Sequence, residues 1–405
     1  LESIQHWVAD LTVSGMEVMP NLNRLRKSSL SWDYVMDVTW MGRTSDAEYA
    51  VMTGLLPDAR FREPGLGRRA QAPQYLGHFL QDHGYRTSSF HGYKRSFWNR
   101  AYNHPVYGIQ DMYFEEVYPP DITHGLGTPD PVVYDYFVDK LTAEPDAKTF
   151  SLLISLSSHH PFIYTPEKYN DYFGGFSMED GWGLAGPYIR SARYADDCIG
   201  DLLAALEEKD LLKDSMIVIY GDHDMGYIGT EKSLPGTGSN MFTPMEDRIP
   251  LVIAVPGEEE FIARHGPFHS DATGGLHDLM PTLLHLLGYP TPKGIVGTNL
   301  LLPAQIRPPV PLPVGSEGRT FAFRHGISFE LLGGRVEPIE ADVPVADSAP
   351  AFDQAYLDQL VSHALLMDPK VLERAEKLAQ SLRSTPGEAV ASSASAGNRV
   401  AKHSE

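Results

Sequence analysis

The chain has 405 residues, of which 42% are hydrophobic and 21% are charged, so it is long enough for one large α/β domain with appendages or for two domains. Its formal net charge of −20, without a basic stripe, argues against a nucleic-acid partner and against tight docking to an anionic lipid surface. The single cysteine, Cys198, excludes an internal disulfide and a thiolate metal cluster. Its neighbours have helical periodicity, so we expect a buried structural thiol.

The first residues lack the features of a targeting segment. The sequence opens on Leu1, Glu2 and Ser3, with no initiator Met, no basic region and no signal peptide. No run of about 18 apolar residues occurs in the sequence, so no segment of it is predicted to span a membrane. We expect the sequence to be a fragment whose upstream part is missing.

The first part of the chain centres on a polar loop around Thr44. Pro20 starts a short amphipathic helix, residues 32–39 are predicted to form a strand, and a helix over residues 45–52 follows the loop. Thr44 before an acidic first turn is the pattern of an N-cap. The same geometry suits a functional hydroxyl, because a helix N-terminus presents free backbone N–H groups to a phosphate. The local sequence leaves both interpretations open.

Three later apolar runs each end in residues that suit metal or phosphate chemistry. Strands are predicted over residues 85–90, 148–156, 215–220 and 249–255. The first three are followed by His91, by His159, and by the pair Asp222 and His223. Helices predicted over 166–170, 187–209 and 277–288 separate these strands, which indicates an α/β fold with a doubly wound, mainly parallel sheet. Ligands bind beyond the carboxyl ends of such strands, so we predict a site there.

Trp98 and Arg100 form an aromatic and basic pair on a loop after the first of these strands. A core tryptophan beside an exposed arginine is one interpretation. A pair that stacks on a ligand and clamps a phosphate is the other.

Beyond residue 302 the composition changes. Residues 303–318 are Pro-rich and are predicted to be a linker, and residues 319–339 alternate like a small antiparallel sheet. The last residues, rich in Ser and Ala, are predicted to be disordered. The predicted division is a main domain over 1–302, a linker with a small sheet over 303–345, helices over 346–383 and a tail over 384–405.

Six motifs, taken together and in order, carry a resemblance to a known family. They are Leu-Glu-Ser at 1–3, Gly-Arg-Thr-Ser-Asp-Ala-Glu at 42–48, Phe-Trp-Asn-Arg at 97–100, Ser-His-His-Pro-Phe at 158–162, Tyr-Gly-Asp-His at 220–223 and Asp-Leu-Met-Pro-Thr-Leu-Leu-His-Leu-Leu-Gly at 278–288. In these motifs the chain resembles the extracellular catalytic domain of lipoteichoic acid synthases and related phosphoglycerol transferases, members of the alkaline phosphatase/sulfatase superfamily. The similarity runs from Leu1 to about Leu302 and more weakly to about Arg374.

The resemblance implies a metal-dependent site with a threonine nucleophile, which Thr44 matches. It also implies one divalent ion, Mn²⁺ or Mg²⁺, held by Glu2, Thr44, Asp222 and His223. A glycerophosphate group would be bound by another set of residues, namely Arg43, His91, Trp98, Arg100 and His159.

The implied reaction moves a glycerophosphate headgroup from a phosphatidylglycerol-like lipid donor to a glycan or polyglycerophosphate acceptor. Thr44 would displace diacylglycerol from the donor, and an acceptor hydroxyl would then take the glycerophosphate from Thr44. The resemblance further implies membrane helices upstream of Leu1 and a catalytic domain on the extracytoplasmic face of the cell membrane.

The chain departs from the family pattern in two places. Asp224 follows His223 where relatives commonly have Tyr, which puts the donor and the acceptor in question. The family's catalytic domain also begins with an apolar strand that ends at the metal-binding Glu, whereas only Leu1 precedes Glu2. We therefore expect the first core strand to be truncated and the metal to bind poorly.

Other functions remain open on the sequence. Phosphoethanolamine transferases resemble this family in fold, nucleophile and metal, but they are usually disulfide-rich. A sulfatase-type hydrolase would need a Cys/Ser-x-Pro-x-Arg run, which does not surround Thr44, and a two-metal phosphatase would need additional ligands such as His277 and Asp278. A non-catalytic module that binds glycerophosphate polymers is the last alternative.

Overall fold

The structure, a computed structural model, describes the chain in segments. These are residues 1–39, 44–57, 72, 74–122, 125–173, 185–225, 248–257, 268–270, 272–302, 307, 310–313, 320–324, 327–332 and 335–338. Within these segments, no helix combines the length and the apolar character needed to cross a bilayer.

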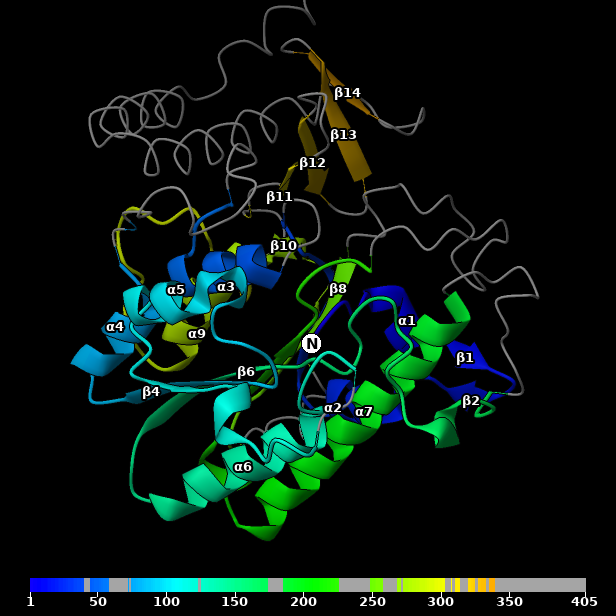
Figure 1. Ribbon diagram of the computed structural model, residues 1–405. Helices are drawn as coiled ribbons and strands as arrows, with labels where there is room; N and C mark the ends of the chain where they lie inside the picture. The colour runs from blue at the N-terminus through cyan, green and yellow to red at the C-terminus, as the bar shows by residue number, and fades with distance from the viewer. Residues whose placement is uncertain are drawn as a thin grey trace, which may run out of the picture.

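Helices and strands alternate through the main part of the chain (Figure 1). The α-helices are α1 (His6–Asp10), α2 (Pro20–Arg26), α3 (Thr44–Thr53), α4 (Leu76–Asp82), α5 (Arg100–Val106), α6 (Asp130–Ala143), α7 (Ala185–Glu208) and α9 (Leu279–Leu286). Short 3₁₀ helices are η1 (Phe97–Asn99), η2 (Glu115–Val117), η3 (Glu167–Tyr169), η5 (Leu212–Asp214) and η7 (Leu276–Asp278). The strands are β1 (Thr12–Val13), β2 (Met16–Glu17), β3 (Leu30–Met36), β4 (Arg86–His91), β5 (Asp111–Tyr113), β6 (Thr149–Ile154), β7 (Ile217–Tyr220), β8 (Arg248–Ala254), β9 (His269–Ser270) and β10 (Gly274–Gly275).

Two sheets form the centre of the α/β fold. One has the order β5-β4-β6 and is parallel throughout. The other has the order β10-β3-β8-β7, with β9 also paired to β3. In it β3 is parallel to β9 and β10, but β8 is antiparallel to both β3 and β7. The apolar run of β8 predicted a doubly buried strand correctly, but such a run carries no information about strand direction.

Strand β8 shows that helices cover both faces of its sheet. Leu251 and Ile253 belong to a core that includes residues of α3, α4 and α9. Val252, which points to the opposite face, belongs to a second core with residues of α1, α2 and α7. The predicted α/β layering is therefore present, with helices on either side of the strands.

Helices α6 and α7 cover β4 through a third core. Phe90 of β4 stacks edge to face on Phe137 of α6, with ring centroids 5.1 Å apart. Cys198 of α7 lies in the same core and is 2% exposed. The predicted buried thiol is confirmed, and burial raises the pKa of that thiol well above its usual range.

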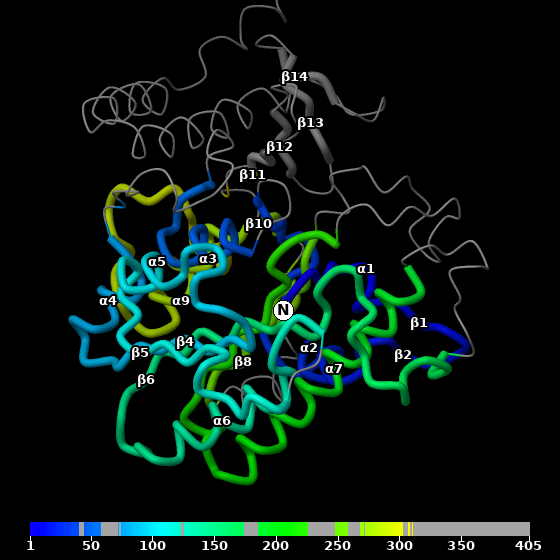
Figure 2. Tube along the Cα trace, viewed as in Figure 1, coloured from blue at the N-terminus to red at the C-terminus, as the bar shows by residue number. Residues whose placement is uncertain are grey.

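The first residues of the chain lie in the middle of the molecule (Figure 2). Leu1 N donates to Tyr220 O at 2.6 Å, and Asp222 N donates to Leu1 O at 3.0 Å, the pattern of one rung of a parallel ladder on β7. Glu2 N donates to Ser155 Oγ, just beyond β6, at 2.8 Å. A cavity of about 830 Å³ is lined by both β6 and β7, together with Leu1, Glu2 and parts of the surrounding helices.

The predicted C-terminal sheet is present, and it begins earlier than expected. Strands β11 (Val310–Pro313), β12 (Thr320–Arg324), β13 (Ile327–Leu332) and β14 (Arg335–Pro338) pair antiparallel in that order. The linker prediction for 303–318 fails at Arg307 and Val310, which are buried, and at β11. The prolines of this segment predict a linker, but an edge strand such as β11 also tolerates proline. The helices and the tail predicted over 346–383 and 384–405 lie outside the described residues.

Candidate functional site

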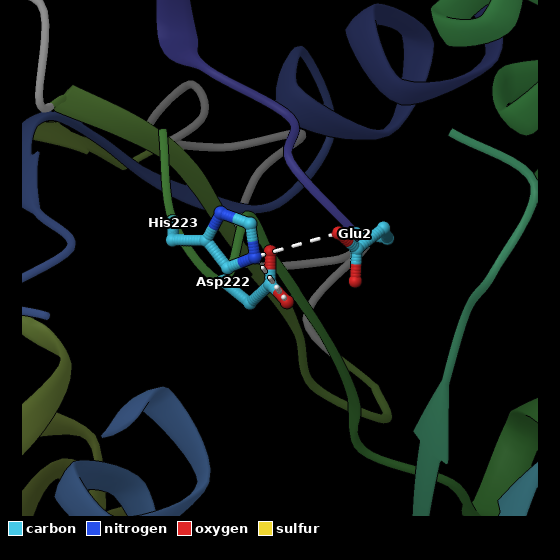
Figure 3. A group of neighbouring side chains, drawn as sticks. All are labelled: Glu2, Asp222 and His223. Atoms are coloured by element: carbon cyan, nitrogen blue, oxygen red, sulfur yellow. Dashed lines mark ion pairs between the residues drawn. The ribbon is translucent and has the colours of Figure 1, made fainter. Parts of the chain in front are cut away.

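Glu2 meets the adjacent residues Asp222 and His223, which are far from it in sequence, at the carboxyl ends of β6 and β7. Glu2, Asp222 and His223 are buried, and one ligand atom from each lies within 4.8 Å of the others. His223 Nε2 is 3.4 Å from Glu2 Oε1 and 3.6 Å from Asp222 Oδ2. Figure 3 shows the imidazole ring directed at both carboxylates.

The electrostatics of this cluster favour positive charge. Burial opposes ionisation of His223, but Asp222 and Glu2 outweigh it and raise its pKa to about 10. For Glu2, burial is likewise outweighed by His223, and the pKa of the carboxyl falls below its usual range. Burial raises the pKa of Asp222, and the nearby Glu2 carboxylate adds to that effect. Two buried carboxylates thus lie beside a single imidazolium, which balances only one negative charge.

Thr44, the first residue of α3, places its hydroxyl against this cluster. Thr44 Oγ1 donates to Glu2 Oε2 at 3.2 Å and lies 3.4 Å from His223 Nε2. Its side chain is buried, with 7% of the residue exposed. The hydroxyl that sequence suggested either as a helix cap or as a functional group is therefore bonded to side chains of the cluster.

Serine side chains and backbone groups hold Glu2 in place. Ser3 Oγ donates to Glu2 Oε1 at 2.9 Å, and Ser3 N donates to Asp222 Oδ1 at 2.8 Å. Ser158 Oγ donates to the Glu2 carbonyl at 2.5 Å. Ser3 has a φ of 54°, a left-handed conformation that is uncommon for a residue with a side chain. Strain of this kind persists only where surrounding bonds over-determine the backbone, as they do here.

The donor set fits a divalent cation. Oxygen and nitrogen donors from two carboxylates, an imidazole and a hydroxyl are ligands that suit Mg²⁺ or Mn²⁺. His223 Nδ1 donates to the Asp224 carbonyl at 2.5 Å, which directs Nε2 toward the carboxylates. The field that holds a proton on His223 would hold a metal ion in its place.

His91 ends β4 and is buried as a neutral ring. His91 Nδ1 donates to the Ile154 carbonyl at 2.9 Å, which leaves Nε2 as an acceptor. Burial, followed by the charge of Arg100, lowers the pKa of His91 to about 3. His159 is only partly buried, and its charge contributes to the low pKa of Glu2. Both predicted histidines thus lie within electrostatic reach of the cluster.

The Phe-Trp-Asn-Arg motif does not place a core tryptophan beside an exposed arginine, which was one of the two interpretations of the sequence. Arg100 is the buried member, at 1% exposure, and its Nε donates to Glu48 Oε1 at 2.8 Å. Trp98 is only partly buried, and its ring centroid lies 5.1 Å from that of Phe97. Trp98 and Asn99 both have a φ of 53°, so the backbone here is strained.

Some predicted residues fall elsewhere, and others escaped prediction. Arg43 lies outside the described residues. The Asp278 carboxylate accepts hydrogen bonds from Arg307, Gly275 and Thr298. In the described structure Asp278 therefore belongs to a structural hydrogen-bond network. Glu48, which bonds to Arg100, was missed; its spacing of four residues from Thr44, one helical turn, was the available signal.

With this geometry established, the comparisons with known proteins identify the family. Residues 1–289 match the family described as Sulfatase. The chain belongs to the sulfatase family. Within it, the chain is 30% identical to the lipoteichoic acid synthase-like YvgJ of Bacillus subtilis over 78% of its own length and 51% of that protein. It is also 30% identical to the lipoteichoic acid synthase of Staphylococcus saprophyticus, over 74% of the chain and 46% of that protein.

Solved structures support the fold of this sulfatase-family chain. The lipoteichoic acid synthase LtaP of Listeria monocytogenes superposes with a TM-score of 0.68 at 22% identity, covering 95% of this chain and 91% of LtaP. A protein of the alkaline phosphatase superfamily from Vibrio parahaemolyticus gives a TM-score of 0.67 at 19% identity, covering 90% of this chain and 85% of that one. The predicted resemblance is confirmed, and the chain spans about half the length of the curated relatives it matches.

Proposed function

We propose that this chain is the catalytic part of a metal-dependent phosphoglycerol transferase. The donor is a phosphatidylglycerol-like lipid, and the acceptor is a hydroxyl of a glycan or a polyglycerophosphate chain. The observation that carries the proposal is the contact of the buried Thr44 hydroxyl with Glu2 and His223, inside a cluster that attracts a cation. The 30% identity to proteins named as lipoteichoic acid synthases supports the choice of substrate class.

In the proposed reaction, Thr44 Oγ1 attacks the donor phosphorus. The Oγ1–P bond forms as the P–O bond to diacylglycerol breaks, and the diacylglycerol oxygen gains a proton in place of the one that Thr44 loses. An acceptor hydroxyl then attacks the same phosphorus and releases Thr44, which regains its proton.

Each residue of the cluster has a role in this scheme. Glu2 accepts the hydrogen bond of Thr44 and so orients Oγ1. Glu2, Asp222 and His223 would hold Mn²⁺ or Mg²⁺, which when bound lowers the pKa of the Thr44 hydroxyl and neutralises charge on the phosphate. Arg100 is proposed to bind the phosphate oxygens. Trp98, the partly buried His159 and the neutral His91 are proposed to lie beside the glycerol, where His91 Nε2 can accept a hydrogen bond from a glycerol hydroxyl. Arg43 is assigned to the phosphate-binding group from sequence alone.

The location follows from the proposed donor. A phosphatidylglycerol-like lipid is presented at a membrane surface, so we propose that the domain works on the extracytoplasmic face of the cell membrane. Attachment through helices ahead of Leu1 is part of the same proposal.

The cavity between β6 and β7 supports one structural addition to the proposal. Leu1 forms a single parallel rung on β7, and β6 and β7 line the cavity that continues from it. We propose that an extended apolar segment ahead of Leu1 fills this space and fixes Glu2. Mn²⁺ titration of a chain extended by such a segment should give tighter binding than the present chain. Equal affinity would refute the addition.

Intact-protein mass spectrometry after incubation with phosphatidylglycerol and Mn²⁺ tests the function. A gain of one glycerophosphoryl group on the wild-type chain, absent in Thr44→Ala, supports both the nucleophile and the donor. A gain of one phosphoethanolamine group from phosphatidylethanolamine, without an adduct from phosphatidylglycerol, would move the assignment to phosphoethanolamine transfer. Consumption of donor without any adduct in quenched time points would favour a hydrolase.

A further inference from the structure

A second buried charged cluster lies one helical turn beyond Thr44. Glu48 of α3 accepts hydrogen bonds from Arg100 Nε at 2.8 Å and from His104 Nε2 at 3.0 Å, one on each carboxylate oxygen. Glu48 is 4% exposed, Arg100 1% and His104 0%. Arg100 and His104 are four residues apart on α5, so both lie on the face of that helix that meets α3.

The direction of the hydrogen bonds in this cluster can be assigned. Burial opposes ionisation of Glu48, but Arg100 and His104 outweigh it and lower its pKa to about 2. An ionised carboxylate only accepts, so His104 Nε2 must carry a proton. His104 Nδ1 is 3.0 Å from Ser89 Oγ of β4, which anchors the far side of the ring. Glu48 is thus held rigidly between two donors.

One buried nitrogen of Arg100, Nη1, is an unpaired hydrogen-bond donor within the described part of the chain. Among the described residues, Nη1 has no hydrogen-bond acceptor although it is shielded from solvent. An unpaired buried donor on a charged group costs free energy, which a bound anion would recover. Glu48 lies one helical turn from Thr44 on α3, so the guanidinium that Glu48 binds at 2.8 Å lies close to the Thr44 site. Thr44 and Glu48 line the same cavity.

We propose that Glu48 is a positioning residue, which holds Arg100 by its Nε so that Nη1 is directed at the phosphate of the donor. The inference rests on the proposed function and adds to it a residue that does not itself touch substrate. Thr44 and Glu48 both belong to α3, and Glu48 binds Arg100 of α5. Helix α3 therefore fixes the distance between the nucleophile and the arginine that binds the phosphate. Such fixed placement of a charged donor favours binding, since no side-chain ordering is needed when the ligand arrives.

The test measures the affinity for glycerol phosphate by calorimetry, with Mn²⁺ saturating. We expect Glu48→Gln to raise the dissociation constant for glycerol phosphate about tenfold or more, as for the loss of one charge-assisted contact. The dissociation constant for Mn²⁺ itself should stay within about twofold, because Glu48 is outside the metal cluster. A general loss of structure would change both constants.

A double-mutant cycle separates positioning from other effects. If Glu48 acts through Arg100, Glu48→Gln should change glycerol phosphate binding by less than about twofold in an Arg100→Gln background. The matched control is Glu144→Gln, which breaks an exposed Glu–Arg pair with Arg86 and should leave both affinities unchanged. Should Glu48→Gln fail to fold, Glu48→Asp, which keeps the charge but withdraws it by one methylene, takes its place.

The possible outcomes distinguish the inference from the proposed function. Wild-type binding of glycerol phosphate that Glu48→Gln does not weaken overturns the positioning role and leaves the proposed function standing. An undiminished effect of Glu48→Gln in the Arg100→Gln background likewise overturns it. If the wild-type chain binds Mn²⁺ but not glycerol phosphate, the proposed function fails and the inference with it.

Discussion

Two buried charged clusters in this chain differ in how completely their charges are paired. Around Asp278, both carboxylate oxygens accept hydrogen bonds from Thr298 N at 2.6 Å, Gly275 N at 3.0 Å and Arg307 Nη2 at 2.6 Å. Arg307 in turn donates to the carbonyls of Thr273 at 2.8 Å and Asn299 at 2.6 Å. One negative and one positive charge are matched, and each is surrounded by backbone groups.

The cluster of Glu2, Asp222 and His223 is unbalanced by comparison. Two carboxylates share one imidazolium, which is a deficit of positive charge in a buried site. Burial of charge is tolerated when it is paired or coordinates a metal. The paired cluster is therefore expected to support folding, and the unbalanced cluster to support cation binding and chemistry. Each prediction below changes one residue in, or in contact with or beside, one of these clusters.

Thr44→Ala should have the largest effect on function. Removal of Oγ1 eliminates the atom on which the proposed covalent step depends, so adduct formation from phosphatidylglycerol should be lost completely. The remaining ligands Glu2, Asp222 and His223 should still bind Mn²⁺. Quenched mass spectrometry measures the first effect and calorimetry the second. An adduct of unchanged mass on the alanine variant would assign the nucleophile elsewhere.

Asp278→Asn should have the largest effect on stability. It leaves the Arg307 guanidinium buried without its counter-charge, and breaking one partner of a buried ion pair costs roughly 3–5 kcal/mol. Urea denaturation monitored by circular dichroism gives the change in free energy of unfolding. The Mn²⁺ affinity of the folded variant should not change. A metal defect with little loss of stability would place Asp278 in the functional cluster instead.

Asp222→Asn should show the opposite pattern. Loss of a charged ligand should weaken Mn²⁺ binding by at least about 100-fold, or about 2.7 kcal/mol. Without metal, the free energy of unfolding should change less than in Asp278→Asn, because the substitution removes one of two competing carboxylates. The pair of variants thus forms a crossed test. If both variants lose the same property, the two clusters do not differ in role.

Much of this site was predictable from sequence because its residues follow strands. His91 and Asp222 lie at the ends of apolar runs, and chain topology alone brings the ends of such strands together. The placement of Glu2 at the end of a strand was not predictable from hydrophobic periodicity, because only Leu1 precedes Glu2 in the sequence. It depended on the family resemblance, and the structure then placed it against Asp222 through Ser3.

Other features depended on contacts that local sequence does not encode. The antiparallel direction of β8 follows from its pairing with β3 and β7 and not from its composition. Glu48 is part of the predicted helix after Thr44, and its pairing with Arg100 spans 52 positions of sequence. The Pro-rich composition of 303–318 predicts a linker, whereas the guanidinium of Arg307 is buried against Asp278. Long-range pairing decided each of these cases, between strands for β8 and between charges for Glu48 and Arg307.

His91 offers the smallest and most specific test, because it lies beside the unbalanced cluster as a neutral base. Its pKa is lowered from 6.5 to about 3 by burial and by Arg100. As the pH falls below about 6.5, His91 binds a proton in the unfolded chain but not in the folded chain. The contribution of His91 to the free energy of unfolding is therefore complete above pH 6.5 and is lost as the pH falls toward 3. Between pH 7 and pH 5.5, the wild-type chain should lose about 1 kcal/mol more than His91→Gln in urea denaturation with a chelator present. Parallel curves for the two chains would mean that His91 is charged in the folded state, and that the site tolerates a second imidazolium.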